Sequence, residues 1–235
     1  MKVLIIGNGI AGFSAASTLR RLNGRCEIEI ISAEANPLYS PCVLPDYVSG
    51  DIPRERVFVK SLIDYERLSL KVLFNQQAKE IDPPKKRVLT DQNKRIVYDK
   101  LVLATGSQAI RFGSPQGGIF TLKTLRDADA ILKHRGKKAV VIGAGPIGIE
   151  VAMALLSRGY KVSVIEMMDH VLPLGLDAKG ARKVEAVLEE RGIEIFTGER
   201  SEKILGEEQV QGVVTNRREI ECDTLIWAVG MRPKV

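Results

Sequence analysis

The sequence predicts an α/β fold made of two similar units, because one strand–turn–helix pattern occurs twice. The segment MKVLIIGNGIAG near the start of the chain returns as KAVVIGAGPIG, with each of three glycines 136 residues further along. In both copies an apolar, β-branched run precedes the glycines and a helical pattern follows them. A second strand-like run, CEIEIIS or KVSVIE, comes after each helix. The order of these elements is that of a Rossmann-like unit.

The glycines in each copy form the motif GxGxxG between a strand and a helix. The first glycine permits the tight turn, the second lets the backbone approach a pyrophosphate, and the third allows the helix to pack closely on the strand. The helix N-terminus offers N–H groups and the positive end of its dipole to an anion. A ligand-free glycine turn is the alternative, but two correctly placed copies favour two dinucleotide sites. These glycines are Gly7, Gly9 and Gly12, and Gly143, Gly145 and Gly148.

An acidic residue is expected after the second strand of each unit, where it accepts hydrogen bonds from a ribose. Glu166 directly follows KVSVI in the second copy. Its carboxylate would repel a 2′-phosphate, and the segment EMMDH holds no arginine to bind one, so the site is predicted to prefer NAD(H) to NADP(H). In the first copy Ser32 occupies this position, and Glu34 is the expected ribose partner, with a solvated loop acid as the alternative. Glu29 is expected to lie within the strand.

Each unit continues into a strand-rich stretch and ends in a strand followed by a glycine turn. In the first unit the runs LKVLFN, KRVLTD and RIVYD suggest a small antiparallel excursion. The strand–turn KLVLATGS then has a counterpart in TLIWAVGMRP, and the segment FTLKTLRDADAILKHRG predicts a helix leading into the second unit. We therefore expect two Rossmann-like, three-layer ββα domains, comprising residues 1–112 and 113–235.

The composition excludes several classes of protein. Hydrophobic residues make up 45% of the chain and charged residues 27%, which is typical of a globular protein. The net charge is +6, but basic and acidic residues are interspersed. The basic runs at 85–87 and 135–138 are interpreted as solvated turns before strands, and no aromatic-studded basic surface for nucleic acid is evident. Apolar runs are too short to span a bilayer, and the N-terminus lacks a signal-peptide pattern, so a cytoplasmic location is expected.

The cysteines and histidines do not form a metal motif. Cys26, Cys42 and Cys222 are widely spaced, and the only two histidines are scattered, so no metal site is predicted. Cys26 and Cys222 fall on strand patterns and are assigned to packing. Cys42, in the segment YSPCVLP, is either a redox-active thiol or a buried, inert one.

The chain resembles the FAD-dependent pyridine nucleotide–disulfide oxidoreductase superfamily. The resemblance rests on GNGIAG, YDKLVLATGS, LRDADAI, GAGPIGIE, Glu166 and AVGMRP in this order. It implies that the first unit binds FAD and the second NAD(H). The FAD residues it implies are Gly7, Gly9, Ile10, Ala11, Gly12, Glu34, Cys42, Ala78, Ala104, Thr105 and Gly106. Those for NAD are Gly143, Gly145, Pro146, Ile147, Gly148, Glu150, Glu166 and Gly230.

Within this superfamily, the segment YSPCVLPDYVSG is most similar to the single-cysteine NADH oxidases and coenzyme A-disulfide reductases, and also resembles nitrite- and rubredoxin-reductase relatives. The implied reaction passes a hydride from NADH to FAD and then electrons to an acceptor, with Cys42 as the catalytic candidate. The acceptor is a small molecule or a small redox protein. Because the family's chains continue beyond AVGMRP, the FAD domain is expected to be incomplete and the NAD domain complete. The alternative is a truncated or partner-dependent NADH-binding subunit, completed by a homo- or hetero-oligomeric partner.

Overall fold

The computed structural model describes residues 1–113 and 116–234. Contacts between Cα atoms divide the chain into two compact units. One contains Met1–Ser40, Glu55–Ser107 and residues 233–234, and the other contains Pro41–Arg54 and Gln108–Arg232. The segment that carries Cys42 therefore belongs to the same compact unit as the second glycine motif. The division into cofactor domains at residue 112 stays a prediction.

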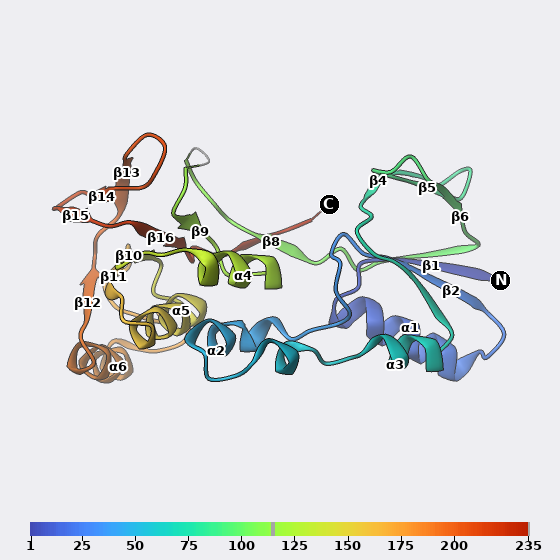
Figure 1. Ribbon diagram of the computed structural model, residues 1–235, viewed down its shortest axis with the longest axis horizontal. Coiled ribbons are helices and arrows are strands. Elements are labelled where there is room, and N and C mark those ends of the chain that lie inside the picture. The colour runs from blue at the N-terminus through green and yellow to red at the C-terminus, as the bar shows by residue number, and fades with distance from the viewer. Residues whose placement is uncertain (114–115, 235) are drawn as a thin grey trace. The chain divides into compact units, whose positions relative to one another are not determined.

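The first unit contains a four-stranded parallel sheet in the order β3-β2-β1-β7. Side chains alternate across it, so Val3 and Ile5 pack with Phe13 of α1 on one face, while Leu4 and Ile6 pack with Val88 on the other. Figure 1 shows α1 and α3 on one side of these strands and the small sheet β4-β5-β6 on the other. The elements are β1 (Lys2–Ile6), α1 (Ile10–Leu22), β2 (Glu27–Ile31), the 3₁₀ helix η2 (Arg54–Val57), α3 (Leu62–Arg67), β3 (Leu70–Leu73), β4 (Ala78–Asp82), β5 (Arg87–Thr90), β6 (Arg95–Val97) and β7 (Lys100–Leu103).

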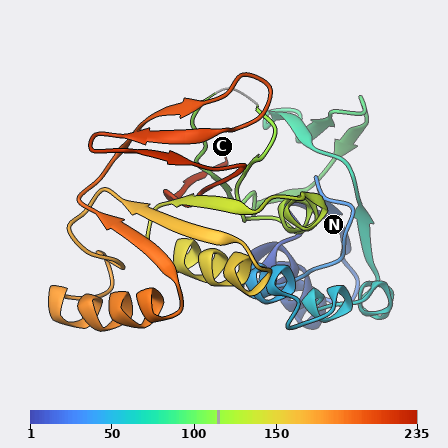
Figure 2. The ribbon, with the colours of Figure 1, turned by 60° about the vertical axis from the view of Figure 1, so that its left-hand side comes forward.

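The second unit repeats this plan with a five-stranded parallel sheet in the order β12-β11-β10-β16-β9. Figure 2 shows helices α5 and α6 below this sheet and the red strands β13–β15 above it. Its elements are η1 (Pro41–Val43), α2 (Leu44–Ser49), β9 (Ile119–Phe120), α4 (Leu125–Lys133), β10 (Lys138–Ile142), α5 (Pro146–Ser157), β11 (Lys161–Glu166), α6 (Ala178–Glu190), β12 (Ile193–Thr197), β13 (Ser201–Leu205), β14 (Gly212–Thr215), β15 (Glu219–Glu221) and β16 (Thr224–Trp227). The short strands β8 (Ser107–Ala109) and β17 (Met231–Pro233) complete the chain. Both units thus have the predicted three-layer ββα architecture.

The antiparallel excursion of the first unit differs from its prediction in one strand. Leu70–Leu73 pairs parallel to β2 as a member of the main sheet, and the antiparallel sheet instead begins with Ala78–Asp82. A short apolar run is compatible with either pairing, and only the tertiary partner decides between them. The exposed, charged pattern of AKEID gave little indication of a strand.

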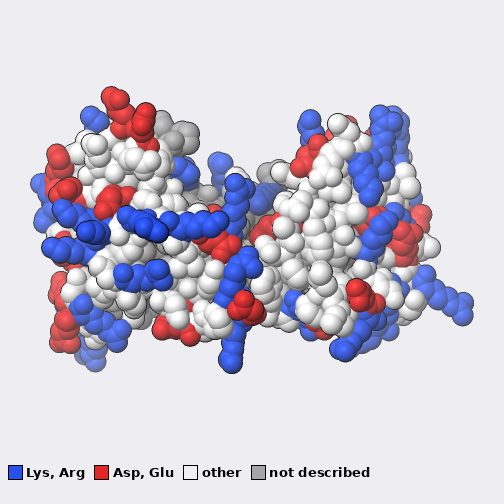
Figure 3. Space-filling view, viewed as in Figure 1, with Lys and Arg blue, Asp and Glu red and all other residues white. Residues whose placement is uncertain are grey.

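The predictions for the basic runs and the two packing cysteines are confirmed. The run at 85–87 precedes and enters β5, and the run at 135–138 precedes and enters β10. Figure 3 shows Lys and Arg side chains spread over one face of the molecule, with Asp and Glu between them. Cys26 and Cys222 are buried at 4% and 2% exposure, although each lies one residue outside a strand. Among the described residues, no helix is long and apolar enough to cross a membrane.

Candidate cofactor sites

The first glycine turn, Gly7–Gly12, closes tightly onto neighbouring backbone. Gly7 has a φ of +114°, and a Cβ built there would overlap the carbonyl oxygen of Ala104. A Cβ at Gly12 would overlap the carbonyl of Gly7, whereas a Cβ at Gly9 would meet nothing within 4 Å. The first and third glycines are therefore required by the fold itself. Gly9 faces open space at the N-cap of α1, where a ligand could approach the backbone.

The second turn, Gly143–Gly148, repeats this geometry. Gly143 has a φ of +104°, and a Cβ there would lie 2.5 Å from the carbonyl oxygen of Ala228. Gly148 closes on the Gly143 carbonyl, and a Cβ at Gly145 would again meet nothing within 4 Å. Gly145 is the N-cap of α5, and Pro146 occupies its first turn, where its missing N–H removes no helical hydrogen bond. The repeat in the sequence is thus a repeat in the backbone.

The two turns are anchored by different groups. In the first, Asn8 accepts a hydrogen bond from the Tyr65 hydroxyl at 2.8 Å and donates to the Asn36 carbonyl at 3.3 Å. Tyr65 is buried and its hydroxyl also accepts the N–H of Leu38 at 3.0 Å. Burial raises the pKa of Tyr65 above its ordinary value, although these two bonds act to lower it. Sequence reasoning missed Tyr65, because 57 residues separate it from Asn8.

In the second turn, Glu166 supplies the anchor. Its Oε2 accepts the backbone N–H of Ala144 at 2.7 Å, and its Oε1 accepts that of Met168 at 2.9 Å. The side chain lies at the end of β11 and the residue is 9% exposed. Each carboxylate oxygen can accept a further bond. A ribose hydroxyl could therefore bind the carboxylate that already fixes the turn.

The corresponding position of the first unit carries no carboxylate. Ile31 pairs with Ile6 as Ile165 pairs with Ile142, so Ser32 is the equivalent of Glu166. The Ser32 hydroxyl donates to the Glu34 carbonyl at 2.9 Å. Glu34 is half-buried and its Oε2 accepts the Tyr39 hydroxyl at 2.7 Å. Its role as the ribose partner remains a prediction.

The remaining first-unit candidates lie on separate elements. Ile10 and Ala11 are exposed in the first turn of α1, and Ala78 begins β4. Ala104 and Thr105 follow β7, and Gly106 has a φ of +68°. These residues form the turn that closes on Gly7.

A large cavity of about 1310 Å³ lies within the second unit and includes most of the predicted NAD residues. Its predicted members are Gly143, Gly145, Pro146, Ile147, Glu166 and Gly230. Its walls also include Met167 and Met168, the 172–175 segment, and residues 199–204. Gly148 lies buried behind the turn. The open side of the Gly145 turn and the Glu166 carboxylate therefore face the same cavity.

Glu150, like Gly148, is a predicted NAD residue that does not line this cavity. It is exposed on α5, and burial raises the pKa of its carboxyl group, with a further contribution from the charge of Asp46 in α2. Since α2 packs against α5, Glu150 faces the segment that carries Cys42.

Cys42 lies in η1, immediately before α2, and it is exposed. The burial expected of the inert-thiol alternative is therefore not found, and the redox role of the thiol stays a prediction. Leu44 and Val48, which face inward from α2, are fully buried and take the packing role instead. Cys222 differs from Cys42 in being buried, and this burial raises the pKa of its thiol to about 12. Among the described residues, no cluster of His, Cys, Asp and Glu could hold a metal ion.

Comparison with known proteins places the whole chain in one family. The chain is 36% identical to an NADH oxidase of Methanocaldococcus jannaschii, over 100% of this chain and 55% of that protein. It is 32% identical to an NAD(P)H coenzyme A polysulfide/persulfide reductase of Pyrococcus horikoshii, over 100% of this chain and 54% of that protein. A solved NAD-dependent persulfide reductase from A. fulgidus matches with a TM-score of 0.93 and 34% identity, over 100% of this chain and 47% of that one.

The chain thus spans about half the length of the relatives it matches. The family model matches residues 1–235. This full-length match shows that the chain belongs to the pyridine nucleotide-disulphide oxidoreductase family. The two parallel-sheet units with matching glycine turns agree with it.

Proposed function

We propose that this chain carries the FAD- and NADH-binding parts of a flavoprotein oxidoreductase. The observation that carries the proposal is the pair of equivalent turns, each leaving its middle glycine open at a helix N-terminus. Enzymes of this family use FAD and NAD(H). The two turns fit the pyrophosphates of such ligands, because N–H groups and the helix dipole favour an anion there.

The second unit is proposed to bind NADH in the cavity described above. The Gly145 turn would hold the pyrophosphate, and Glu166 would accept hydrogen bonds from the adenosine ribose. Its negative charge would disfavour a 2′-phosphate. Glu150, outside the cavity, is retained as a candidate near the nicotinamide on the strength of the family resemblance.

The first unit is proposed to bind FAD at Gly9 and the first turn of α1. Tyr65 would keep Asn8 in place, so that the turn is ordered before the cofactor arrives. Glu34 would bind the ribose, and Ala78 and the Ala104 turn would line the site. Bound FAD would supply hydride acceptance from NADH and electron transfer to an acceptor, and the chain's own residues would orient the ligands and exclude water.

Cys42 is the proposed route by which electrons leave. An exposed thiol can form a mixed disulfide or a sulfenic acid. Support comes from the persulfide reductases among the similar proteins. Rubredoxin-NAD(+) reductase of Ectopseudomonas oleovorans, which is 30% identical, supports a small redox protein as the acceptor instead. Oxygen would be a third acceptor, supported by the similarity to a water-forming NADH oxidase from Lactobacillus brevis. A cytoplasmic location is also retained as part of this proposal.

The second candidate function is a partner-dependent, NADH-binding electron-transfer subunit. A relative that supports it is an assimilatory nitrate reductase electron transfer subunit of Bacillus subtilis, which is 27% identical. A homo- or hetero-oligomeric partner is part of this hypothesis.

Two measurements test the proposal. The first is the FAD content of the purified chain and its NADH affinity. A partner-dependent, NADH-binding subunit is expected to bind NADH without stoichiometric FAD. The second compares the wild-type protein with Cys42→Ser in NADH oxidation with a polysulfide, with oxygen and with rubredoxin, after FAD is added. Loss of polysulfide turnover alone would assign the thiol to that acceptor. Full turnover of Cys42→Ser with every acceptor would exclude the thiol route.

A further inference from the structure

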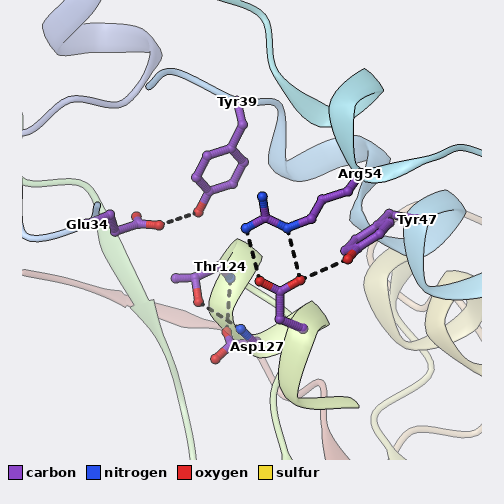
Figure 4. Close-up of polar contacts among 7 residues, drawn as sticks. Glu34, Tyr39, Tyr47, Arg54, Thr124 and Asp127 are labelled. Atoms are coloured by element: carbon purple, nitrogen blue, oxygen red, sulfur yellow. Dashed lines mark hydrogen bonds and ion pairs between the residues drawn. The ribbon is translucent and has the colours of Figure 1, made fainter. Parts of the chain in front are cut away.

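One carboxylate on α4 binds two side chains from the segment that carries Cys42. The Tyr47 hydroxyl donates to Oδ1 of Asp129 at 2.9 Å. The Arg54 guanidinium donates through Nε to Oδ1 at 3.4 Å and through Nη2 to Oδ2 at 3.2 Å. Figure 4 shows Tyr47 and Arg54 approaching this carboxylate together, with the dashed lines of the three bonds. We refer to Tyr47, Arg54 and Asp129 as the α4 latch.

The charges of the latch reinforce its geometry. Burial acts to raise the pKa of Asp129, but the hydrogen bonds and charge of Arg54 and the bond from Tyr47 outweigh it, so this pKa is lowered. Burial raises the pKa of Tyr47, and the Asp129 carboxylate raises it further. Asp129 is therefore ionised and Tyr47 neutral at neutral pH. This is the state in which one carboxylate accepts from both donors.

The latch holds a short segment of the chain at two points. Tyr47 lies within α2, and Arg54 lies beyond the left-handed Gly50 that ends the helix. The buried residues of α2 are Leu44, Pro45 and Val48, and the helix packs against α4 and α5. A six-residue helix has little stability of its own. The orientation of α2 therefore depends on its tertiary contacts. Among these contacts, the hydrogen bonds of the latch constrain its direction, because hydrogen bonds require a defined geometry.

We propose that Asp129 is a positioning residue, which through Tyr47 and Arg54 fixes the Cys42 segment onto the unit that holds the Gly143–Gly148 turn. Asp129 does not contact the thiol. It restricts the movement of residues 41–54 and thereby sets where Cys42 is presented. The benefit to electron transfer rests on the proposed function of Cys42, but the mechanical role of the latch does not.

The test compares Asp129→Ala with Asp127→Ala in the full chain. Both residues lie on α4, but Asp127 caps that helix, accepting the N–H of Thr124 at 2.9 Å, whereas Asp129 binds the segment. Alkylation of the three cysteines by iodoacetamide is followed by peptide mapping, together with hydrogen exchange of residues 41–54. We expect Asp129→Ala to accelerate hydrogen exchange of residues 41–54 by roughly tenfold, the effect of losing charged hydrogen bonds, whereas the Cys42 thiol is already exposed and its alkylation should change little. The Asp127→Ala variant should leave both rates near those of the wild type.

Two further variants separate positioning from general destabilisation. Asp129→Glu should restore most of the slow exchange, since a carboxylate is again present. Tyr47→Phe removes one donor and should give an intermediate rate, which keeps the test decisive if Asp129→Ala does not fold. Buried Cys26 and Cys222 report on global unfolding in the same sample. Unchanged hydrogen exchange of residues 41–54 in Asp129→Ala, or equal acceleration in Asp127→Ala, would overturn the proposal, whatever the Cys42→Ser turnover experiment shows about the thiol.

Discussion

Glu166 accepts the backbone N–H of Ala144 at 2.7 Å, so the acid expected to bind a ribose also holds the glycine turn expected to bind a pyrophosphate. The predicted ribose-binding acid and the predicted pyrophosphate-binding turn are thus joined by a direct hydrogen bond. A change at Glu166 is expected to affect both ligand selectivity and the shape of the turn. Selectivity must therefore be tested in a way that separates these effects.

The first prediction concerns cofactor choice. Replacing Glu166→Ser and Met167→Arg together removes the negative charge and supplies a guanidinium beside the exposed end of β11. We expect the double variant to favour NADPH over NADH by about tenfold or more, because a guanidinium binds a 2′-phosphate by charge-assisted hydrogen bonds. Dissociation constants for both nucleotides, from quenching of Trp227 fluorescence or from calorimetry, provide the measurement. Met167→Arg alone is the control; a preference for NADPH with Glu166 intact would contradict the role given to its charge.

The second prediction separates the two kinds of glycine in the Gly143–Gly148 turn. Gly145→Ala should fold normally, since its Cβ meets nothing within 4 Å, yet bind NADH at least about tenfold more weakly because the backbone can no longer approach the pyrophosphate. Gly143→Ala should lower the free energy of unfolding by about 1–3 kcal/mol, because its φ of +104° strains any side chain. Denaturant unfolding and NADH titration of both variants check this. Equal stability and equal affinity in the two variants would refute it.

The third prediction concerns Tyr65, the anchor of the first turn. Tyr65→Phe leaves Asn8 and the Leu38 N–H without this partner, and should cost about 1–3 kcal/mol of stability and weaken FAD binding. The pKa of Tyr65 is raised in the folded protein, so its contribution is complete below the ordinary tyrosine pKa near 10 and is lost as pH rises through the folded value. Unfolding curves recorded between about pH 8 and pH 11 should therefore converge for the two proteins at the alkaline end. Phe13→Leu, which removes a ring contact of Tyr65 but no hydrogen bond, is the control and should keep the wild-type pH slope.

The fourth prediction concerns the buried carboxylate of Glu29. It binds Lys2 at 2.6 Å and Lys71 at 3.1 Å. Burial acts to raise its pKa, but the bonds and charges of these two lysines lower it overall. Its stabilising contribution is thus present above the ordinary glutamate pKa and is lost as pH falls through the folded value.

Lys2→Met should destabilise the fold more than Lys71→Met. The Lys2 side chain is 23% exposed and that of Lys71 is 58% exposed, so solvent screens the Lys71 pair more strongly. We expect about 1–3 kcal/mol for Lys2→Met and under about 1 kcal/mol for Lys71→Met. Glu29→Gln should flatten the acid limb of stability below about pH 5. An acid limb unchanged in Glu29→Gln would show that other carboxylates control it.

Much of the fold could be read from the sequence because it depends on local patterns. The strand–glycine–helix repeat predicted both parallel-sheet cores, and the position of Glu166 after KVSVI predicted its place at the end of β11. The pairing partners of the short strands were harder to predict from the sequence. Leu70–Leu73 is a short apolar run that fits a parallel or an antiparallel neighbour equally well, and AKEID has too little apolar character to indicate a strand.

The sequence by itself determined the two glycine turns and the acid beside the second, because tight turns and strand ends are set by residues close together in the chain. The side chains that anchor these turns and α2 could be identified only from the fold. Tyr65 reaches Asn8 from 57 residues away, and Asp129 reaches Tyr47 from 82 residues away. The tertiary structure also shows Cys42 exposed in η1, since burial depends on how this segment packs on the core. Contacts between distant residues are fixed by the packing of whole elements, for which a single sequence contains no local signal.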